Sequence, residues 1–465
     1  MKNSSLISIP PRGLGIILMI GPSLVWASEY IGSGEVIIAT RTGAILGSGV
    51  IWAIIIGVFL KFWIGMSGAR YTVLTGEGMI DMFNRIPGPK HWVVWFVLVA
   101  QFVAGTISIG SVATAAGIFL SSLLPISPEL GGWMVTIFAF LVAWIGEFKW
   151  LKIVMSILIL VVIIGVFYVC AHVMPTFSEM LRGIIPHKPE LADWVVRNNI
   201  TDNPWKEILP LLGWGAGGFA SQVWYSYWVM GAGYGATRKN VYGIPADVQM
   251  LKSYTTEDAG KLKGWCRMIY YDSSFAMIIG ILVTSGFLIA GAGILGPREI
   301  APDGPQVAFQ LSNLFSTHWG KLGGVLFLIG GTAALVSTNI GQLAGWPRLL
   351  ADSFRICIPA FNRKFKWKTQ FRMFLCFFFV SNMVIIYTLG YQPVVLVKFS
   401  AILEGLLLTP LQAIWILIAT YSVMPKLFQP EVSKQLKPHW IIAAGLVIAF
   451  LFFGYFCVYQ IPSIL

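Results

Sequence analysis

Two glutamates flank a glycine-rich interruption in the first long apolar segment of the chain. Residues 21–44 read GPSLVWASEYIGSGEVIIATRTGA, in which Glu29 precedes and Glu35 follows the short run Gly32, Ser33 and Gly34. A charged side chain at the centre of a bilayer costs about 2.5–3.5 kcal/mol on insertion scales, so an acid inside such a segment usually has a function. Carboxylates beside unwound backbone carbonyls form an oxygen-rich, negatively charged cage that suits a hard cation. The stretch therefore predicts a cation site within the membrane.

Each glutamate of this stretch has a binding role and an alternative role. As metal ligands we expect Glu35, Glu29 and the backbone of Gly32, and as further contacts to the substrate Ile31, Ser33 and Gly34. Glu35 also stands at the N-terminal end of the second half-helix, where a carboxylate can simply cap free N–H groups. Glu29 can instead form an ion pair with Arg41 or Arg70. The spacing alone does not decide between these roles.

A second glycine cluster lies in the sixth apolar segment, where residues 213–221 read GWGAGGFAS. Each glycine costs about 0.5–1 kcal/mol relative to alanine in a regular helix, so the cluster indicates either unwound backbone or very close helix packing. Unwound backbone at membrane depth must be buried or must line a polar cavity. In that case the segment supplies neutral ligands to the same substrate, from Gly213, Gly217, Gly218 and Ser221.

Polar residues in other apolar segments are candidates to surround this site. They are Tyr225 in the sixth segment, Asp272 in the seventh, Thr338 and Asn339 in the eighth, and Glu404 in the tenth. Glu404 is isolated in the apolar run SAILEGLLLTP and is expected to face the interior of the helix bundle. Its candidate partner is Lys398, although residues six apart do not share one helix face.

The composition indicates an integral membrane protein. Of the 465 residues, 57% are hydrophobic and 11% are charged, whereas an ordinary soluble domain has about 25% charged residues. Apolar runs of about 20 residues, long enough to cross a bilayer, recur along the whole chain and leave no room for a separate soluble domain. The five cysteines have no CxxC spacing and the five histidines no i, i+4 pair. We therefore expect no cofactor, and no phosphate loop or nucleophile motif points to an enzyme.

Hydropathy and charge together predict the topology. Eleven spans are expected, at residues 14–47, 49–83, 92–124, 132–146, 152–174, 207–237, 266–293, 318–350, 370–389, 393–424 and 438–460. Most of the 32 Lys and Arg residues fall in loops on the same side as the N-terminus. By the positive-inside rule, the N-terminus is then cytoplasmic and the C-terminus outside.

The same distribution of Lys and Arg residues indicates which partners and which cellular location to expect for the protein. It accounts for the net charge of +12 without a nucleic-acid partner. The expected partners are the lipid bilayer and a small transported ion or solute, and the sequence leaves the oligomeric state open. A multi-pass chain without a cleavable signal or transit peptide suits the cell membrane, specifically a bacterial inner membrane.

Interrupted helices in the first and sixth spans indicate an internal repeat. The two occupy corresponding positions if residues 14–174 and 207–424 are two five-helix halves, with 438–460 as an additional helix of one transmembrane domain over 1–465. Paired interrupted helices are a sequence sign of an inverted-repeat transporter, whose substrate site lies near the bilayer midplane.

Four stretches resemble the Nramp family of divalent-metal transporters. Residues 21–44 look like its first helix, which runs G-P-G, then D-P-G-N and later S-G-A, and residues 69–79, ARYTVLTGEGM, are similar to the R-L-G-V-V-T-G of its second helix. YYDSSFAMIIG and STNIGQLAG resemble its seventh and eighth helices. The resemblance implies a LeuT-type, all-helical fold and proton-linked uptake of manganese, iron and similar ions.

The chain departs from this family at the ligand positions. Gly32, Ser33 and Glu35 stand where the family has the Asp, Pro and Asn of D-P-G-N. The M-P-H triplet of the sixth helix is replaced by Gly217, Gly218 and Phe219, or with a gap by Ala220 and Ser221. Loss of the soft methionine ligand favours hard cations such as magnesium or manganese. Acids of the family's proton path align with Gln101, Ser108 and Ser111, which do not titrate near neutral pH.

Two functions of different kinds follow from these observations. The first is a secondary transporter that moves a divalent cation by alternating access. The second keeps the fold and moves an organic amine or amino acid, coupled to sodium or protons, with cation–π contacts from Phe219, Trp224, Tyr225, Tyr227 and Trp228. These aromatic residues also fit a belt at the membrane interface.

Overall fold

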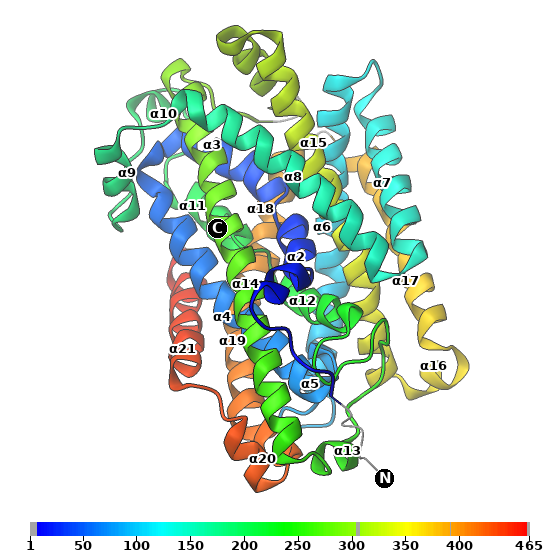
Figure 1. The fold of residues 1–465 in the computed structure, drawn as a ribbon. Coiled ribbons are helices and arrows are strands. Elements are labelled where there is room, and N and C mark those ends of the chain that lie inside the picture. Colours follow the sequence, from blue (N-terminus) through cyan, green and yellow to red (C-terminus); the bar gives the residue numbers. More distant parts are fainter. Residues whose placement is uncertain (1–6, 304–306, 391, 463–465) are drawn as a thin grey trace.

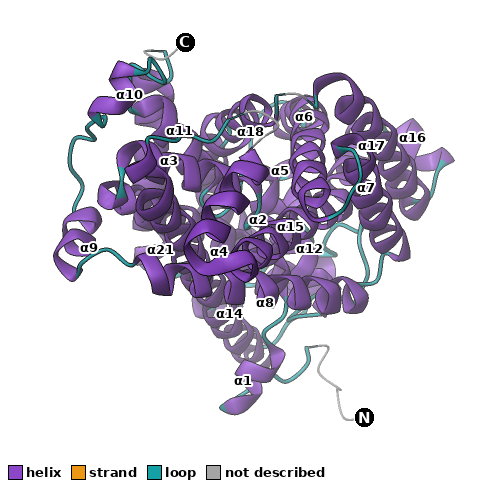
Figure 2. Ribbon diagram, turned by 90° about the horizontal axis from the view of Figure 1, so that it is seen from above, coloured by secondary structure: helices purple, strands orange, loops and turns teal. Residues whose placement is uncertain are grey.

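The described part of the chain is a bundle of helices. The computed structural model describes residues 7–303, 307–390 and 392–462, and these contain helices, turns and loops but no strand. In Figures 1 and 2, α2 (Pro22–Tyr30) and α12 (Phe219–Ala232) lie near the middle of the bundle. Helix α21 (Trp440–Tyr455) lies at one edge, and α7 (Pro128–Ile145) and α17 (Trp367–Leu389) lie at the opposite edge.

Nine helical stretches of the described residues are long and apolar enough to cross a membrane. Besides α7, α17 and α21, they are built on α4 (Ile51–Thr75), α6 (Trp92–Leu123), α8 (Phe148–Val173), α14 (Thr256–Ala290), α15 (Val307–Cys357) and the pair α18 (Pro393–Ile402) and α19 (Thr409–Ile418). Each coincides with one of the predicted spans. The two remaining predicted spans, the first and the sixth, are each divided into shorter helices.

The divided spans break where the glycines lie. The first consists of α1 (Leu14–Met19), α2, the π-helical turn η1 (Gly34–Ala39) and α3 (Thr40–Leu46). The sixth consists of α11 (Trp205–Trp214) and α12, with four residues between them. The prediction of two interrupted helices is therefore confirmed.

Two helices extend well beyond their predicted spans. Helix α14 begins at Thr256, whereas the predicted span begins at 266, and α15 ends at Cys357, whereas the predicted span ends at 350. The added turns of α14 read TEDAGKLKG, a polar sequence that a hydropathy window rejects. They are helical because Thr255 and Asp258 form a capping box, each side chain accepting from the other's backbone N–H.

Short helices fill the connections at the two ends of the bundle. Helices α9 (Phe177–Ile184) and α10 (Asp193–Arg197) lie at one end, and α13 (Val248–Lys252), α16 (Pro359–Lys364) and α20 (Pro430–Gln435) lie toward the other (Figure 1). A further short helix, α5 (Met79–Asn84), follows α4. The segments predicted to share the cytoplasmic side thus lie toward the same end of the molecule.

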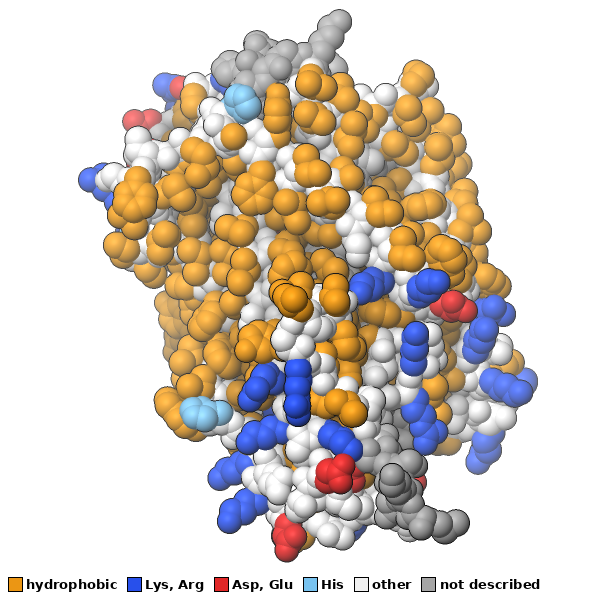
Figure 3. Space-filling view, viewed as in Figure 1, with side chains coloured by type: hydrophobic (Ala, Val, Ile, Leu, Met, Phe, Trp, Pro, Cys, Tyr) orange, Lys and Arg blue, Asp and Glu red, His pale blue; other side chains and the backbone are white. Residues whose placement is uncertain are grey.

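The outer surface matches a lipid environment. Large apolar side chains point outward from α7, α8, α17 and α21, for example Leu141, Ile157, Val380 and Leu451. Figure 3 shows hydrophobic side chains over most of this face, while Lys and Arg gather over its lower part. Burial of apolar surface against lipid explains the exposed side chains, because lipid tails are as apolar as the protein core.

The interior is packed closely enough for backbones to touch. Helix α3 meets η3 (Gly291–Leu295), the π-helical turn that continues α14, through two glycines. A Cβ atom on Gly43 would lie 2.0 Å from the Leu288 carbonyl oxygen, and one on Gly291 would lie 1.9 Å from the Thr40 carbonyl oxygen. Small residues of this kind let membrane helices approach closely and gain van der Waals contact.

This contact predicts that Gly291→Ala destabilises the protein, by about 1–3 kcal/mol, the usual cost of overpacking. The backbone of α3 must move away because the atom nearest the new methyl group is a backbone oxygen. Thermal unfolding of the purified protein measures the effect. Gly260→Ala in the same helix is the matched control, since a Cβ there meets nothing within 4 Å. Equal unfolding temperatures for the two variants would contradict the close contact.

Candidate functional site

The first break is shaped by two tightly packed glycines. Ile31 leaves the helix with φ −77° and ψ 94°, after its N–H has donated to the Ala27 carbonyl. A Cβ on Gly32 would lie 2.0 Å from Thr338 Oγ1 of α15, and one on Gly34 would lie 2.5 Å from Cβ of Trp214, the last residue of α11. Glycine is therefore required here by close approach, and the two broken segments contact each other at their breaks.

Glu35 folds back onto the break that precedes it. Its Oε2 accepts from the Gly32 N–H at 2.7 Å, and its Oε1 accepts from Thr284 Oγ1 of α14 at 3.3 Å. The carboxylate is fully buried. It satisfies a free N–H group in the manner of the acidic residue of a capping box. The geometry thus gives Glu35 the capping role, and a role in cation binding stays a prediction.

The oxygens of this break are also engaged within the protein. The Gly32 carbonyl accepts from the N–H groups of Glu35 at 3.1 Å and Val36 at 2.9 Å, so it starts the following π-helical turn. The Ile31 carbonyl accepts from Thr338 Oγ1 at 3.3 Å. Ser33, which was also predicted to contact the substrate, is buried inside the protein.

The second break reverses the twist of the backbone. Ala216 and Gly217, between α11 and α12, both adopt left-handed conformations, with φ 59° and 74°. Left-handed backbone is costly for alanine, so surrounding contacts must hold it. Gln222 Nε2 does so by donating to the Ala216 carbonyl at 2.7 Å. A Cβ on Gly218 would lie 2.7 Å from Cβ of Glu404, so the break packs directly against the tenth segment.

Lys61 holds the carbonyl groups that this reversal exposes. The side chain comes from the middle of α4, is fully buried, and donates from Nζ to the Gly213 carbonyl and, at 2.8 Å, to the Gly217 carbonyl. Lys61 lies within the second predicted span and is not among the predicted site residues. The available signal was a single lysine in the run IIIGVFLKFWIG, because an intramembrane charge points to function by default.

Glu29 and Ser221 are brought together across the two broken segments. Ser221 Oγ donates to Glu29 Oε2 at 2.8 Å and accepts from Trp26 Nε1 at 3.1 Å. Gly341 of α15 packs against the side chain of Glu29, since a Cβ on Gly341 would lie 2.2 Å from Cγ of Glu29. Glu29 is buried, with 3% of its surface exposed.

The ion pairs suggested for Glu29 do not form. Arg41 pairs with Glu207 of α11, Nε to Oε2 at 3.2 Å, because it lies on α3 beyond the break. Arg70 donates to the Leu436 carbonyl at 2.5 Å and to Tyr270 Oη at 3.0 Å. Both arginines lie away from the breaks, nearer to the ends of the bundle, and they bind groups near those ends.

Glu404 caps the second half of the sixth segment. Its Oε2 accepts from the Ala220 N–H at the start of α12 at 3.1 Å, and its Oε1 accepts from Gln101 Nε2 at 2.7 Å. The suggested pair with Lys398 is wrong, because Lys398 Nζ donates to Glu207 at 2.8 Å. Six residues along a helix exceed one and a half turns, which places the two side chains on different faces.

The other candidates lie further from the breaks. Asp272 accepts from the N–H groups of Gly21 at 3.1 Å and Ser23 at 2.9 Å, from Ser23 Oγ at 2.9 Å, and from Tyr225 Oη at 2.8 Å. It therefore caps the N-terminus of α2. This helix is nine residues long, so the capped end lies about 13 Å along the helix axis from the end at the break. Asn339 donates to the Ile109 carbonyl at 3.4 Å, while its Oδ1 has no partner among the described residues.

Four buried charged groups thus surround the two breaks. Glu29 lies within electrostatic range of Glu35 and Glu404, and Lys61 within range of Glu35 and Glu404. Over the described residues, no three His, Cys, Asp or Glu side chains already form a metal-binding group. The arrangement can attract a cation electrostatically, and ligation needs a rearrangement of the carboxylates.

Comparison with known proteins identifies relatives of this chain. The family model described as Natural resistance-associated macrophage protein-like, Nramp, matches residues 23–196 and 242–455. The divalent metal cation transporter MntH of Yersinia enterocolitica is 28% identical over 98 residues, which are 20% of this chain and 24% of MntH. An uncharacterized protein of Pasteurella multocida is 23% identical over 219 residues, 45% of this chain and 47% of that protein. The chain thus aligns with less than half the length of either curated relative.

Solved structures agree with the observed fold. A manganese transporter of Eremococcus coleocola is similar with a TM-score of 0.63 and 17% identity, over 97% of this chain and 90% of that one. MhsT in complex with L-phenylalanine is similar with a TM-score of 0.53 and 14% identity, over 96% and 99% of the two chains. At these identities the likeness shows the fold, which confirms the expected LeuT-type architecture of a multi-pass membrane protein.

The cap on α2 predicts that Asp272→Asn lowers stability. An amide presents its own donors to a site made only of donors, so the variant loses charge-assisted hydrogen bonds of about 1.5–3 kcal/mol each. The thermal unfolding temperature of the purified protein checks this. Glu257→Gln is the matched control in the same helix, because Glu257 is exposed and forms a surface ion pair with Lys261. A shift no larger than that of the control would show that the cap carries little energy.

Proposed function

Because the chain belongs to the Nramp family, we propose that it is a transporter that moves a divalent metal cation across the membrane by alternating access. The observation that carries this proposal is the buried charge at the two breaks. In their ionised forms, the three buried carboxylates of Glu29, Glu35 and Glu404 and the buried ammonium of Lys61 together carry a formal charge of −2. Buried charge in a low-dielectric interior is costly unless it is compensated, and one divalent cation compensates it fully.

The proposed cation site lies between α2, η1 and α12. Its ligands are the Glu35 and Glu29 carboxylates, the Ile31 carbonyl and Ser221 Oγ, which now contact protein groups that a cation can replace. Lys61 occupies the Gly213 and Gly217 carbonyls, so those oxygens serve the lysine rather than the cation. All proposed ligands are oxygen atoms, which favours hard cations such as magnesium or manganese over softer metals.

Alternating access in this proposal uses the two halves of the chain. Residues 14–174 and 207–424 form the two five-helix repeats, and 438–460 adds a helix beside them. The site lies where both repeats are interrupted, as in transporters whose bundles rock around a central substrate. With the N-terminus in the cytoplasm, the Lys- and Arg-rich end of the molecule is the inner end.

An organic substrate is less well supported by the aromatic residues of α12. Tyr225 donates to Asp272 and stacks on Trp26 with ring centroids 4.4 Å apart. Tyr227 donates to Asp352 at 2.8 Å, and Trp224 packs edge-on against Trp346 at 4.7 Å. These three rings are buried against protein groups, which speaks against both a belt at the membrane interface and contacts to an amine.

The proposal predicts that Glu35→Gln weakens cation binding by about tenfold or more, because the site loses a full negative charge. Isothermal titration of manganese, magnesium and calcium into the purified protein measures this. The fold survives because the glutamine carbonyl oxygen still accepts from the Gly32 N–H. Glu257→Gln at the surface is the control. If none of the three ions binds to folded wild-type protein, the metal-transport proposal fails and an organic substrate takes its place.

Lys61→Gln has the opposite expected effect. The glutamine amide still donates to a carbonyl of the sixth segment, while removal of a nearby positive charge raises divalent affinity by about tenfold. The same titration measures it, with Lys152→Gln as control, since Lys152 Nζ donates to the Ile20 carbonyl before the start of α2. An unchanged affinity in a well-folded Lys61→Gln protein would place the cation away from the two breaks.

A further inference from the structure

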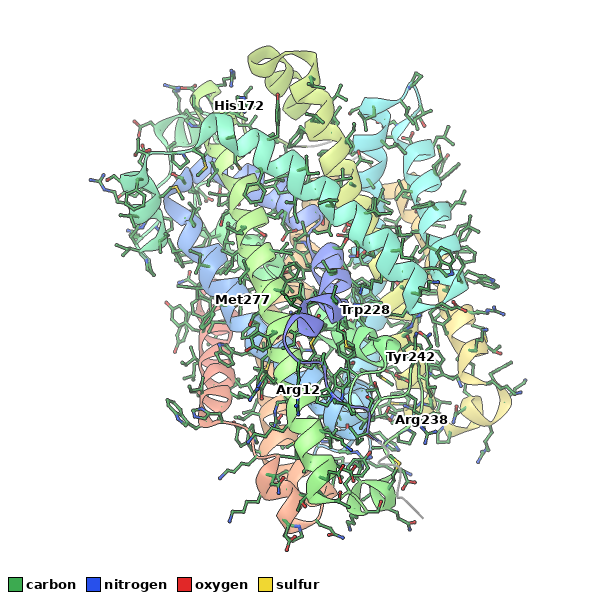
Figure 4. The ribbon with its side chains drawn as sticks, viewed as in Figure 1. Arg12, His172, Trp228, Arg238, Tyr242 and Met277 are labelled. Atoms are coloured by element: carbon green, nitrogen blue, oxygen red, sulfur yellow. The ribbon has the colours of Figure 1, made fainter. Side chains whose placement is uncertain are left out.

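A cleft lies near the Lys- and Arg-rich end of the bundle, apart from the two breaks. It has a volume of about 480 Å³ and lies between the end of α7, the start of α8, the loop residues 240–242, α15 and the start of α17. Tyr242, which lines it, and Trp228, which packs beside it, are labelled in Figure 4. Basic and aromatic side chains dominate its walls: Trp144, Tyr242, Arg348, Lys368, Phe371 and Arg372.

Arg348 is a buried cation that forms no ion pair with a carboxylate of the described residues. Its side chain comes from α15 and is 97% buried, with 3% exposed. It donates to the Ala344 carbonyl and, at 3.1 Å, to the Gly146 carbonyl, and its Nε has no hydrogen-bond partner among the described residues. The guanidinium carbon lies 4.8 Å from the centroid of Phe371 and 5.1 Å from that of Tyr242. Ring contacts orient the group, but they do not neutralise its charge.

Asp352, one helical turn away, lies within electrostatic range of Arg348, but no ion pair joins the two side chains in the described part of the chain. Asp352 accepts from Tyr227 Oη at 2.8 Å, from Trp367 Nε1 at 2.8 Å and from Arg355 at 3.3 Å. Its oxygens are thus used by other donors. A buried charge is costly when it is unpaired, so the Arg348 guanidinium facing this cleft favours an anion there.

Two further cations face the same space. Arg372 lies over Trp144, 4.5 Å from the ring centroid, and its Nε also has no partner in the described part of the chain. Lys368 lines the cleft from the first turn of α17, where the positive end of the helix dipole adds to its charge. Glu147 is the one acidic residue among the lining residues. Three cations and one carboxylate leave the cleft with a net positive charge.

We propose that this cleft binds a phosphate-bearing anion, held by Arg348, Arg372 and Lys368. Arginine presents paired N–H groups that match phosphate oxygens, and a planar guanidinium stacked on an aromatic ring keeps this geometry fixed. The phosphate belongs either to a lipid headgroup or to a soluble phosphate. The outward-facing side chains of Trp144 and Ile145, 37% and 54% exposed, place the rim beside lipid. Basic pockets at the cytoplasmic ends of membrane helices bind anionic headgroups in this way.

Native mass spectrometry of the full-length protein tests the proposal and separates the two sources. The protein is incubated with phosphatidylglycerol, with phosphatidylcholine, or with inorganic pyrophosphate. Retention of phosphatidylglycerol over phosphatidylcholine assigns the cleft to an anionic lipid headgroup. Binding of pyrophosphate without lipid preference assigns it to a soluble phosphate. Binding of none of the three probes overturns the proposal.

Variants tie the bound anion to this cleft. Arg372 and Lys368 lie on accessible parts of the cleft wall, so we expect the variants Arg372→Gln and Lys368→Gln to fold. Each variant is expected to retain about tenfold less of the bound probe. Arg348→Met removes the buried charge, and its thermal unfolding temperature is recorded beside its binding. Lys364→Gln is the control, because this exposed lysine of α16 does not line the cleft. Equal losses in Lys364→Gln and Arg372→Gln would overturn the assignment to the cleft.

Discussion

A helix that is interrupted inside a bilayer must find hydrogen-bond partners for its own backbone, and the centre of this protein is organised by that requirement. No water is present in the hydrocarbon region to satisfy free N–H and C=O groups. At the first break the partners are Glu35 and Thr338, and at the second they are Lys61, Gln222 and Glu404. Charged side chains are used because charge-assisted hydrogen bonds are stronger than neutral ones.

The side chains that bind the free backbone groups at the two breaks also have an electrostatic effect. The side chains that satisfy the backbone also bring charge to the middle of the membrane, where charge is expensive. Their negative excess can be compensated by protons or by a metal cation. Structural support and cation attraction are therefore two effects of one set of residues. In the proposed function, a glutamate that caps a helix end in this structure therefore binds a cation in another state.

Local sequence signals predicted the helices and their breaks well. Hydropathy and glycine spacing are properties of neighbouring residues, so they locate the spans and the interruptions near Gly32 and Gly217. Partnerships across the fold were not predictable in this way. Lys61 reaches carbonyl groups 152 and 156 residues away, and Asp272 caps a helix that begins some 250 residues earlier. A single sequence shows that such a charge is unusual, but it does not show what the charge contacts.

Both halves of the first broken segment are attached to α14, at several points on the two sides of the break. The N-terminus of α2 is bound by Asp272, and α3 rests against Gly291 without an intervening side chain. Helix α14 therefore bridges the break, and a change of the backbone angle at Ile31 and Gly32 must alter at least one of these contacts. The cap at Asp272 is made of hydrogen bonds, whereas the contact at Gly291 is close backbone packing. Any change in the angle between α2 and α3 therefore also changes how each of them meets α14, so a movement at the break involves α14 as well.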